Sequence, residues 1–281
     1  MKKNIQKKLS RVEHLIIIGA MKSGTTSLYE YLSTHSRICR CKTKEPNFFI
    51  EKKGEKCKKK EYRKLWKFDP DRHKYLLEAS TGYTKYPFNE NVPENIERSK
   101  IEPKFIYIVR NPIDRIESHY NFLKVSKSKE IRRFTNKRLV EVSKYFKQME
   151  RFWEVFPDRK RYLIVDFKNM LERPKYVLKK CKKFLDLEEN FECGKKYAQN
   201  KTPSSKMDLW ISKLGWLKNK IGSIMSEKKR RGIKKVLRKI SPKIKHREIG
   251  SAKKMELKNE LQKDMKKFKK EFGFDVGKWD F

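Results

Sequence analysis

The stretch from His14 to Leu28, HLIIIGAMKSGTTSL, combines a short apolar run, a glycine-bounded loop and the start of a helix. The apolar run from Leu15 to Ile18 ends at Gly19, and a helical pattern begins at Thr25. A strand–loop–helix turn of this kind points several backbone N–H groups and the positive end of a helix dipole at one place. Lys22 adds a full charge, and three consecutive hydroxyl groups add donors. The sequence therefore predicts a site for a phosphate-bearing small molecule.

The loop is close to a Walker A loop but departs from it. Walker A has the pattern G-x-x-x-x-G-K-[ST], with the lysine after the second glycine. Gly19 and Gly24 have that spacing, but Thr25 follows them and the lysine, Lys22, lies inside the loop. This departure disfavours a nucleoside triphosphatase. The alternative without a ligand is a glycine-rich turn between a core strand and a helix.

A second segment repeats the strand-to-helix arrangement. The run from Lys104 to Val109, KFIYIV, has the composition of a buried strand, and Asn111-Pro112 is a favourable helix start. Arg110 then lies at the carboxyl edge of a strand, and Ser118 lies about two turns into the following helix. The alternative is an ordinary βα unit whose arginine is a surface cation.

Together the two segments resemble the sulfotransferases that use 3'-phosphoadenosine 5'-phosphosulfate (PAPS). The family has a phosphosulfate-binding loop of the form K-[SG]-G-T-[TR] and a 3'-phosphate-binding motif that R-N-P-x-x-R-x-x-S-x-Y matches. The resemblance implies that Arg110 and Ser118 hold the 3'-phosphate of the nucleotide. It also implies a PAPS-binding loop made of Lys22, Ser23, Gly24, Thr25, Thr26 and Ser27.

Looser matches extend the resemblance along the chain. Cys41 to Phe49, CKTKEPNFF, resembles the K-E-x-x-F-F segment of the heparan-sulfate branch and its bacterial relatives, and Leu76 to Tyr86 resembles the segment that follows it there. Residues 161–187 resemble a later strand and helix, and 274–279 resemble the C-terminal D-x-x-x-W ending. Heparan-sulfate members often have a lysine where Ala79 stands, which weighs against a glucosaminoglycan-specific acceptor site.

Sulfuryl transfer requires a base for the acceptor hydroxyl, in-line alignment, and stabilisation of charge on the leaving oxygen. Lys22 and the loop amides suit the last two tasks. The resemblance assigns the base to Glu45, which without it would be interpreted as a solvated loop acid. His119 is the competing candidate, since many cytosolic sulfotransferases use histidine. No metal is expected, because cationic side chains can take the charge.

Other functions stay open at this stage. One is a nucleotide-dependent kinase or phosphotransferase with an atypical loop, which would require Mg²⁺. Another is a non-catalytic polyanion-binding protein that retains a nucleotide fold. For a sulfotransferase, a carbohydrate is the first expectation for the acceptor, and a lipid or polyketide hydroxyl is the alternative. Acceptor specificity depends on loops and pocket shape.

The predicted fold is a P-loop-like α/β fold with a central parallel sheet and helices on both faces, in a single domain over 1–281. Ligands in such sheets bind beyond the carboxyl ends of the strands, so both phosphate motifs converge on one nucleotide. Strands are expected at 15–18, 75–78, 104–109 and 162–166. Helices are expected at 25–33, 114–124, 137–156, 174–185 and 253–272.

The chain is strongly basic, with a formal net charge of +39 in 281 residues. Lys213 to Arg247 holds fourteen basic residues against the single acid Glu227, with apolar residues at near-helical spacing. A basic amphipathic helical segment at 213–247 is expected. Its basic face would bind an acidic polysaccharide, another anionic surface such as a membrane face, or nucleic acid, or would simply be solvated over a core stripe.

No apolar run reaches the length of a membrane helix, and the first apolar stretch leads into the phosphate loop rather than into a signal-peptide cleavage site. A cytoplasmic protein is therefore expected. The five cysteines include no C-x-x-C pair, so free thiols are favoured over a zinc site. Cys39 and Cys41 are the pair that could ligate a metal instead.

Overall fold

The computed structural model describes residues 12–50, 59–125, 133–191 and 246–281. Its centre is a sheet in the order β2-β3-β1-β4-β5, in which every neighbouring pair is parallel. The strands are β1 (Glu13–Gly19), β2 (Ile38–Arg40), β3 (Tyr75–Ala79), β4 (Pro103–Val109) and β5 (Tyr162–Asp166). The predicted parallel α/β sheet is confirmed.

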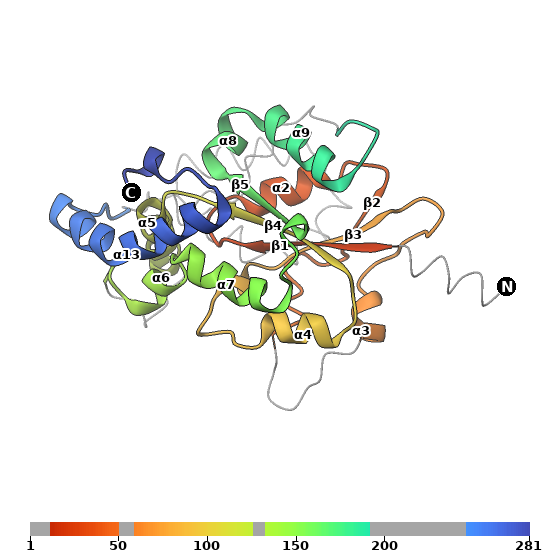
Figure 1. Ribbon diagram of the computed structural model, residues 1–281, viewed down its shortest axis with the longest axis horizontal. Helices are drawn as coiled ribbons and strands as arrows, with labels where there is room; N and C mark the ends of the chain where they lie inside the picture. The colour runs from red at the N-terminus through yellow and green to blue at the C-terminus, as the bar shows by residue number, and fades with distance from the viewer. Residues whose placement is uncertain (1–11, 51–58, 126–132, 192–245) are drawn as a thin grey trace, which may run out of the picture.

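Helices cover both faces of the sheet (Figure 1). One face carries α2 (Thr25–Leu32), α8 (Phe167–Glu172) and α9 (Pro174–Leu185). The other carries α3 (Lys59–Arg63), α4 (Val92–Arg98), α7 (Tyr145–Val155) and α13 (Ser251–Phe272). The helices α5 (Pro112–Val125) and α6 (Lys137–Glu141) pack with α13 in a third cluster. Short 3-10 turns are η1 (Thr81–Thr84), η2 (Arg159–Arg161) and η3 (Gly277–Trp279).

The alternation of side chains along β1 explains why the strand is apolar throughout. Leu15 and Ile17 enter the core under α2 and α9, whereas Ile16 and Ile18 enter the core under α4 and α7. All four are fully buried. A central parallel strand with helices on both faces has no polar side, as its sequence requires.

The expected strands and helices are observed close to their predicted positions, except that one helix is divided, and β2, α4 and α8 were not expected. The edge strand β2 was not predicted, because three residues carry too little pattern. The prediction of a single helix over 137–156 is wrong, because the structure has two helices there, α6 and α7, with a break around Ser143. Ser143 Oγ donates to the Leu139 carbonyl at 2.7 Å, and the guanidinium of Arg115 reaches the same carbonyl at 2.7 Å. These contacts replace the helical ladder at the break.

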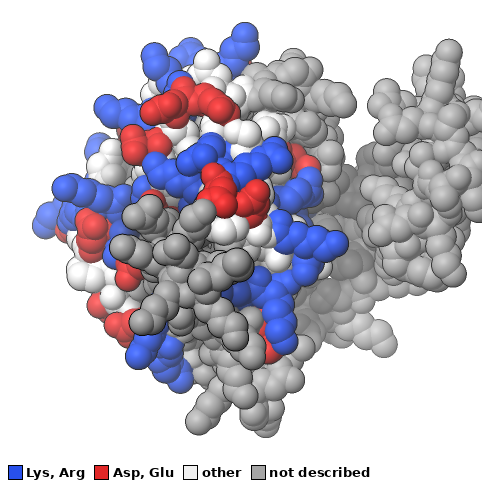
Figure 2. Space-filling model, turned by 90° about the vertical axis from the view of Figure 1, so that its right-hand side faces the viewer, with Lys and Arg blue, Asp and Glu red and all other residues white. Residues whose placement is uncertain are grey.

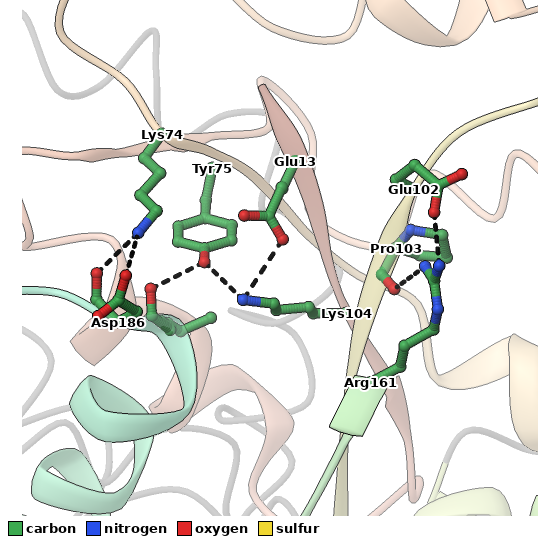
Figure 3. Close-up of polar contacts among 9 residues, drawn as sticks. Glu13, Lys74, Tyr75, Glu102, Pro103, Lys104, Arg161 and Asp186 are labelled. Atoms are coloured by element: carbon green, nitrogen blue, oxygen red, sulfur yellow. Dashed lines mark hydrogen bonds and ion pairs between the residues drawn. The ribbon is translucent and has the colours of Figure 1, made fainter. Parts of the chain in front are cut away.

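At the edge where the strands begin, basic side chains are paired with acidic ones (Figure 3). Lys104 Nζ lies 3.3 Å from Glu13 Oε2 and donates to the Tyr75 hydroxyl at 2.9 Å. Lys74 contacts Asp186 Oδ2 at 3.1 Å, and Arg161 contacts the Glu102 carboxylate at 2.6 Å. Figure 2, which views this side of the molecule, shows Lys and Arg side chains adjacent to Asp and Glu.

Two findings bear on the remaining expectations from the sequence. None of the helices in the described ranges is long and apolar enough to cross a membrane. Within those ranges no group of three metal-ligating side chains occurs, and Cys39, Cys41 and Cys181 are buried free thiols. Burial raises the pKa of the Cys41 thiol to about 11.

Candidate functional site

The loop between β1 and α2 lies at the carboxyl end of the central strand. Neighbouring elements lie close to its two glycines, Gly19 and Gly24. A Cβ on Gly19 would lie 2.1 Å from Thr84 Oγ1 in η1. Gly24 has φ +85, and a Cβ there would lie 2.4 Å from the Met170 side chain of α8. Both positions therefore require glycine, Gly24 for its left-handed backbone as well as for space. The loop is held to β4 by the Ala20 N–H, which donates to the Ile108 carbonyl at 2.7 Å.

The start of α2 has the features of an anion site. Gly24 provides no side-chain cap to the helix, so the positive end of the dipole is not neutralised by a capping side chain. The predicted binding residues differ in exposure: Ser23, Thr25 and Ser27 have buried side chains, whereas Gly24 and Thr26 are partly exposed. Their contact with a nucleotide stays a prediction.

Lys22 extends from the loop toward α5. Its Nζ lies 4.5 Å from the centroid of the Phe122 ring, and no carboxylate within the described ranges forms an ion pair with it. Burial, and then the charge of Arg110, lower the pKa of the Lys22 ammonium from 10.5 to about 8. A partly buried cation of this kind is stabilised by an anion brought to the site.

The second motif lies beside the first. Arg110 directly follows β4, and its guanidinium is 5.1 Å from the Phe167 ring centroid and 3.7 Å from the Asp114 carboxylate. Its charge acts on Lys22, so the structure brings the two predicted phosphate motifs together. Ser118 is partly exposed on α5, one helical turn before Phe122, on the face that meets Lys22.

The helix start predicted at Asn111 is confirmed. Asn111 Oδ1 accepts the N–H of Ile113 at 3.0 Å, as an N-cap does. The backbone at Arg110 is fixed from the other side, where the Tyr145 hydroxyl donates to the Arg110 carbonyl at 2.6 Å. Trp279 near the C-terminus packs against the Tyr145 ring at a centroid distance of 6.2 Å. The C-terminal segment therefore supports the second motif.

Glu45 lies on the loop after β2, beside the end of β3. Its N–H donates to the Ala79 carbonyl at 2.9 Å. Its carboxylate accepts hydrogen bonds from Lys44 Nζ at 2.9 Å and from Thr81 Oγ1 at 3.1 Å. The side chain is 37% exposed, so the carboxylate is oriented by two contacts and still reaches solvent at the carboxyl edge.

Two basic residues of this site were not singled out from the sequence. Lys85 follows η1; burial lowers the pKa of its ammonium, and the carboxylate of Glu45 raises it. Arg115 of α5 is 0% exposed. Lys85 could have been found because it follows the carboxyl end of a predicted strand. Arg115 could have been found because it lies within the R-N-P-x-x-R string, one turn before His119.

His119, the competing candidate for the base, is buried on α5. Its Nδ1 lies 3.3 Å from Arg115 Nη1. Burial, followed by the charges of Arg115 and Lys85, lowers the pKa of the imidazole well below 6.5.

The basic segment expected at 213–247 lies outside the described residues except for its last two, His246 and Arg247. The backbone of Arg247 is bonded to α5, since its N–H donates to Asn121 Oδ1 at 2.8 Å. The N–H of Ile249 donates to Glu117 Oε2 at 2.9 Å. The chain therefore returns from this segment directly onto the helix that carries Ser118.

Comparisons with known proteins agree with this geometry. A family model described as "Sulfotransferase domain" matches residues 12–270. Heparan sulfate glucosamine 3-O-sulfotransferase 5 of Mus musculus is 30% identical over 188 residues, which are 61% of this chain and 53% of that protein. The protein of the same name from Homo sapiens is 29% identical over the same shares. The chain thus spans about half the length of the curated relatives it matches.

A solved structure extends the similarity over nearly the whole fold. The sulfotransferase from Alicyclobacillus acidocaldarius superposes with a TM-score of 0.65 at 19% identity, covering 96% of this chain and 99% of that one. At this identity the likeness concerns the fold.

Proposed function

Because the chain belongs to the sulfotransferase domain family, we propose that it transfers a sulfuryl group from PAPS to a hydroxyl or amine acceptor. The observation that carries the proposal is that Lys22 and Arg110, from two separate phosphate motifs, follow the adjacent parallel strands β1 and β4 at the same edge of the sheet. There the charge of Arg110 lowers the pKa of Lys22. An anionic nucleotide between them relieves that repulsion.

In this proposal the loop holds the phosphosulfate end of the donor and α5 holds the other end. Lys22, the backbone of Ser23 to Ser27 and the dipole of α2 bind the 5' side. Arg110 and Ser118 bind the 3'-phosphate. PAPS supplies the sulfuryl group; the protein supplies alignment and charge. As the bond between sulfur and the leaving phosphate oxygen breaks, the Lys22 ammonium stabilises the charge that grows on that oxygen.

Glu45 is the proposed general base. Its carboxylate takes the proton of the acceptor as the acceptor oxygen or nitrogen forms its bond to sulfur. The contacts from Lys44 and Thr81 support this role because they orient the carboxylate without covering it. Its position next to β3 and near Lys85 puts it on the same edge of the sheet as the loop.

A carbohydrate is the proposed acceptor. Support comes from the similarity to heparan sulfate glucosamine 3-O-sulfotransferase 5 and from the KEPNFF segment that carries Glu45. A lipid or polyketide hydroxyl is the alternative. Pocket shape decides between them.

The nucleotide is tested by thermal shift with 3'-phosphoadenosine 5'-phosphate (PAP), the product of the proposed reaction. A ligand of the folded state raises the melting temperature by an amount that grows with the logarithm of its concentration relative to Kd, and micromolar binding is expected. Lys22→Ala should weaken it, whereas Lys254→Ala, an exposed lysine of α13, should not. An unchanged melting temperature with PAP would refute the assignment.

The reaction is tested by screening acceptors with isotopically labelled PAPS and mass spectrometry. Transfer that persists in excess EDTA counts against a Mg²⁺-dependent phosphotransferase. PAP binding without transfer to any acceptor class would instead favour a non-catalytic nucleotide-binding protein.

A further inference from the structure

Arg115 is a fully buried cation whose hydrogen-bond partners are neutral. Its Nε donates to Ser143 Oγ at 2.9 Å, its Nη2 to the Leu139 carbonyl at 2.7 Å, and its Nη1 to the Met21 carbonyl at 3.4 Å. Within the described residues no carboxylate pairs with it. The guanidinium thus connects α5, the turn between α6 and α7, and the phosphate loop one residue before Lys22.

The same guanidinium fixes the hydrogen on His119. Arg115 Nη1 lies 3.3 Å from His119 Nδ1. A guanidinium has only donors, so Nδ1 must be the acceptor and carries no hydrogen. The neutral ring therefore has its hydrogen on Nε2. This nitrogen is on the ring edge away from Arg115, and it can donate a hydrogen bond but cannot accept a proton.

Charges around the ring keep it neutral. The groups that lower the pKa of His119, after burial, are Arg115 on α5, Lys85 after η1, Lys22 in the phosphate loop and Arg138 on α6. All four are cations, and they come from four different parts of the chain. Protonation of the imidazole would add another positive charge to this group of cations and is therefore disfavoured.

We infer that Arg115 is a positioning residue that holds His119 as a neutral Nε2–H donor to an anionic group bound at the phosphate loop. His119 is therefore not the general base. The inference rests on the proposed function for the identity of the anion, the phosphosulfate end of the nucleotide. A neutral donor fixed before the ligand arrives stabilises developing charge without reorganisation.

The tautomer is measured directly by ¹⁵N NMR on protein labelled at its five histidines, with His119→Gln to assign the signal. His119 should remain an Nε2–H imidazole from pH 5.5 to 9. An Nδ1–H tautomer, or titration near pH 6.5, would overturn the inference. This arm uses the free protein, so its result does not depend on the proposed function.

PAP addition tests the donor role. The Nε2–H signal of His119 should shift when PAP binds. A PAP complex shown by thermal shift that leaves this signal unmoved would refute the donor role. Absence of PAP binding altogether would refute the proposed function and leave the tautomer result standing.

Kinetics of transfer separate a donor from a base. His119→Phe should lower turnover roughly 10- to 100-fold, the worth of one hydrogen bond to a charged group, without changing the shape of the pH profile. His119→Gln, which keeps an N–H donor, should retain more activity than His119→Phe. Equal loss in both variants, or a changed pH profile, would contradict the role.

The positioning role of Arg115 is tested by Arg115→Met, which removes the charge and the donors at similar size. The His119 signal should then show mixed tautomers and a pKa closer to 6.5. Ser143→Ala, a milder variant that frees one anchor of the guanidinium, should move the signal in the same direction. A His119 signal unchanged in a folded Arg115→Met protein would exclude this role for Arg115.

Discussion

Lys22 is the residue whose burial has the most direct consequence for the proposed function. Its ammonium is partly buried between the loop and α5, and no acidic side chain in the described structure forms an ion pair with it. Its pKa of about 8 places the loss of its charge near physiological pH. The affinity of the site for an anion should therefore depend on pH in a range where an exposed lysine is fully charged.

We predict that PAP binds progressively more weakly above pH 8. The charged form of Lys22 binds phosphate, so binding requires proton uptake once the free lysine is neutral, and Kd should rise up to about tenfold per pH unit there. Isothermal titration calorimetry from pH 6.5 to 9.5 measures this. Lys22→Arg, which stays charged throughout, should flatten the dependence. The same slope in both proteins would contradict the prediction.

Arg110 should determine the preference for a 3'-phosphate. The parent protein should bind PAP more tightly than AMP, which lacks that phosphate. Arg110→Ala removes a charge-assisted contact available only to PAP, so it should reduce PAP affinity roughly 10- to 100-fold and AMP affinity far less. Competition binding measures both ratios. Equal affinity of the parent for the two nucleotides would exclude the role.

Glu45→Gln should abolish most turnover while leaving the nucleotide site intact. The amide keeps the size of the side chain but cannot take the acceptor's proton, so turnover should fall by about two to four orders of magnitude. PAP affinity should stay near the parent value. Glu90→Gln, at an exposed acid, is the matched control and should be fully active.

Two results would remove Glu45 from this role. Full turnover in a folded Glu45→Gln protein would show that another group takes the proton. Loss of PAP binding together with turnover would show that Glu45 supports the nucleotide site and would leave the base unidentified.

At the scale of elements, α7 depends on a residue more than a hundred positions away. Asp264 of α13 accepts the N–H of Phe146 at 3.0 Å through Oδ1 and the N–H of Lys147 at 2.9 Å through Oδ2. It therefore caps α7 in place of a local side chain, since Lys144 provides none. The cap also joins α13 to the helix whose first residue, Tyr145, supports Arg110.

We predict that Asp264→Ala destabilises the protein by about 1–2 kcal/mol, the usual worth of a helix N-cap. Urea unfolding measures the change in the free energy of unfolding. Asp264→Asn, which keeps an acceptor oxygen, should lose less. Glu90→Ala, at an exposed acid, is a control for charge. An unchanged stability in Asp264→Ala would mean that the cap contributes nothing.

The elements that the sequence predicts well are those whose signal is local. The β1 and β4 runs are continuously apolar because both faces are covered, and Asn111 caps α5 by local chemistry. The break between α6 and α7 could not be predicted, because the helical pattern continues through it. It is set by tertiary contacts from Arg115 and Asp264.

The candidate site divides in the same way. The loop around Lys22 and the segment around Arg110 are contiguous motifs, and their proximity follows from the rule that parallel strands present their carboxyl ends at one edge. The contact between Arg115 and His119 spans one helical turn, so it could have been predicted from their spacing in the sequence. The burial of Arg115 among neutral acceptors could not be predicted from the sequence, because Leu139 and Ser143 lie outside α5.

At the scale of the whole molecule, the two edges of the sheet differ in whether their basic side chains are paired with carboxylates. At the edge where strands begin, Lys104, Lys74 and Arg161 each meet a carboxylate (Figure 3). At the opposite edge Arg110 and Lys44 are also paired, with Asp114 and Glu45, but Lys22 and Arg115 have no carboxylate partner within the described residues. Net charge alone favours anions everywhere, whereas the unpaired cations favour them at one edge.

The last prediction separates a specific polyanion-binding segment from the general charge of +39. If the basic segment at 213–247 engages an acidic polysaccharide, heparin affinity should fall steeply with salt. Replacing Lys228, Lys229, Arg230 and Arg231 by glutamine should flatten that dependence. The matched control replaces four exposed lysines of α13, namely Lys254, Lys263, Lys266 and Lys270, and removes the same charge. Salt-dependent binding curves compare the three proteins. If the two variants have equal salt slopes, heparin binding is due to net charge. If the variant of Lys228, Lys229, Arg230 and Arg231 keeps the slope of the parent, the segment does not bind the polysaccharide and its basic face is only solvated.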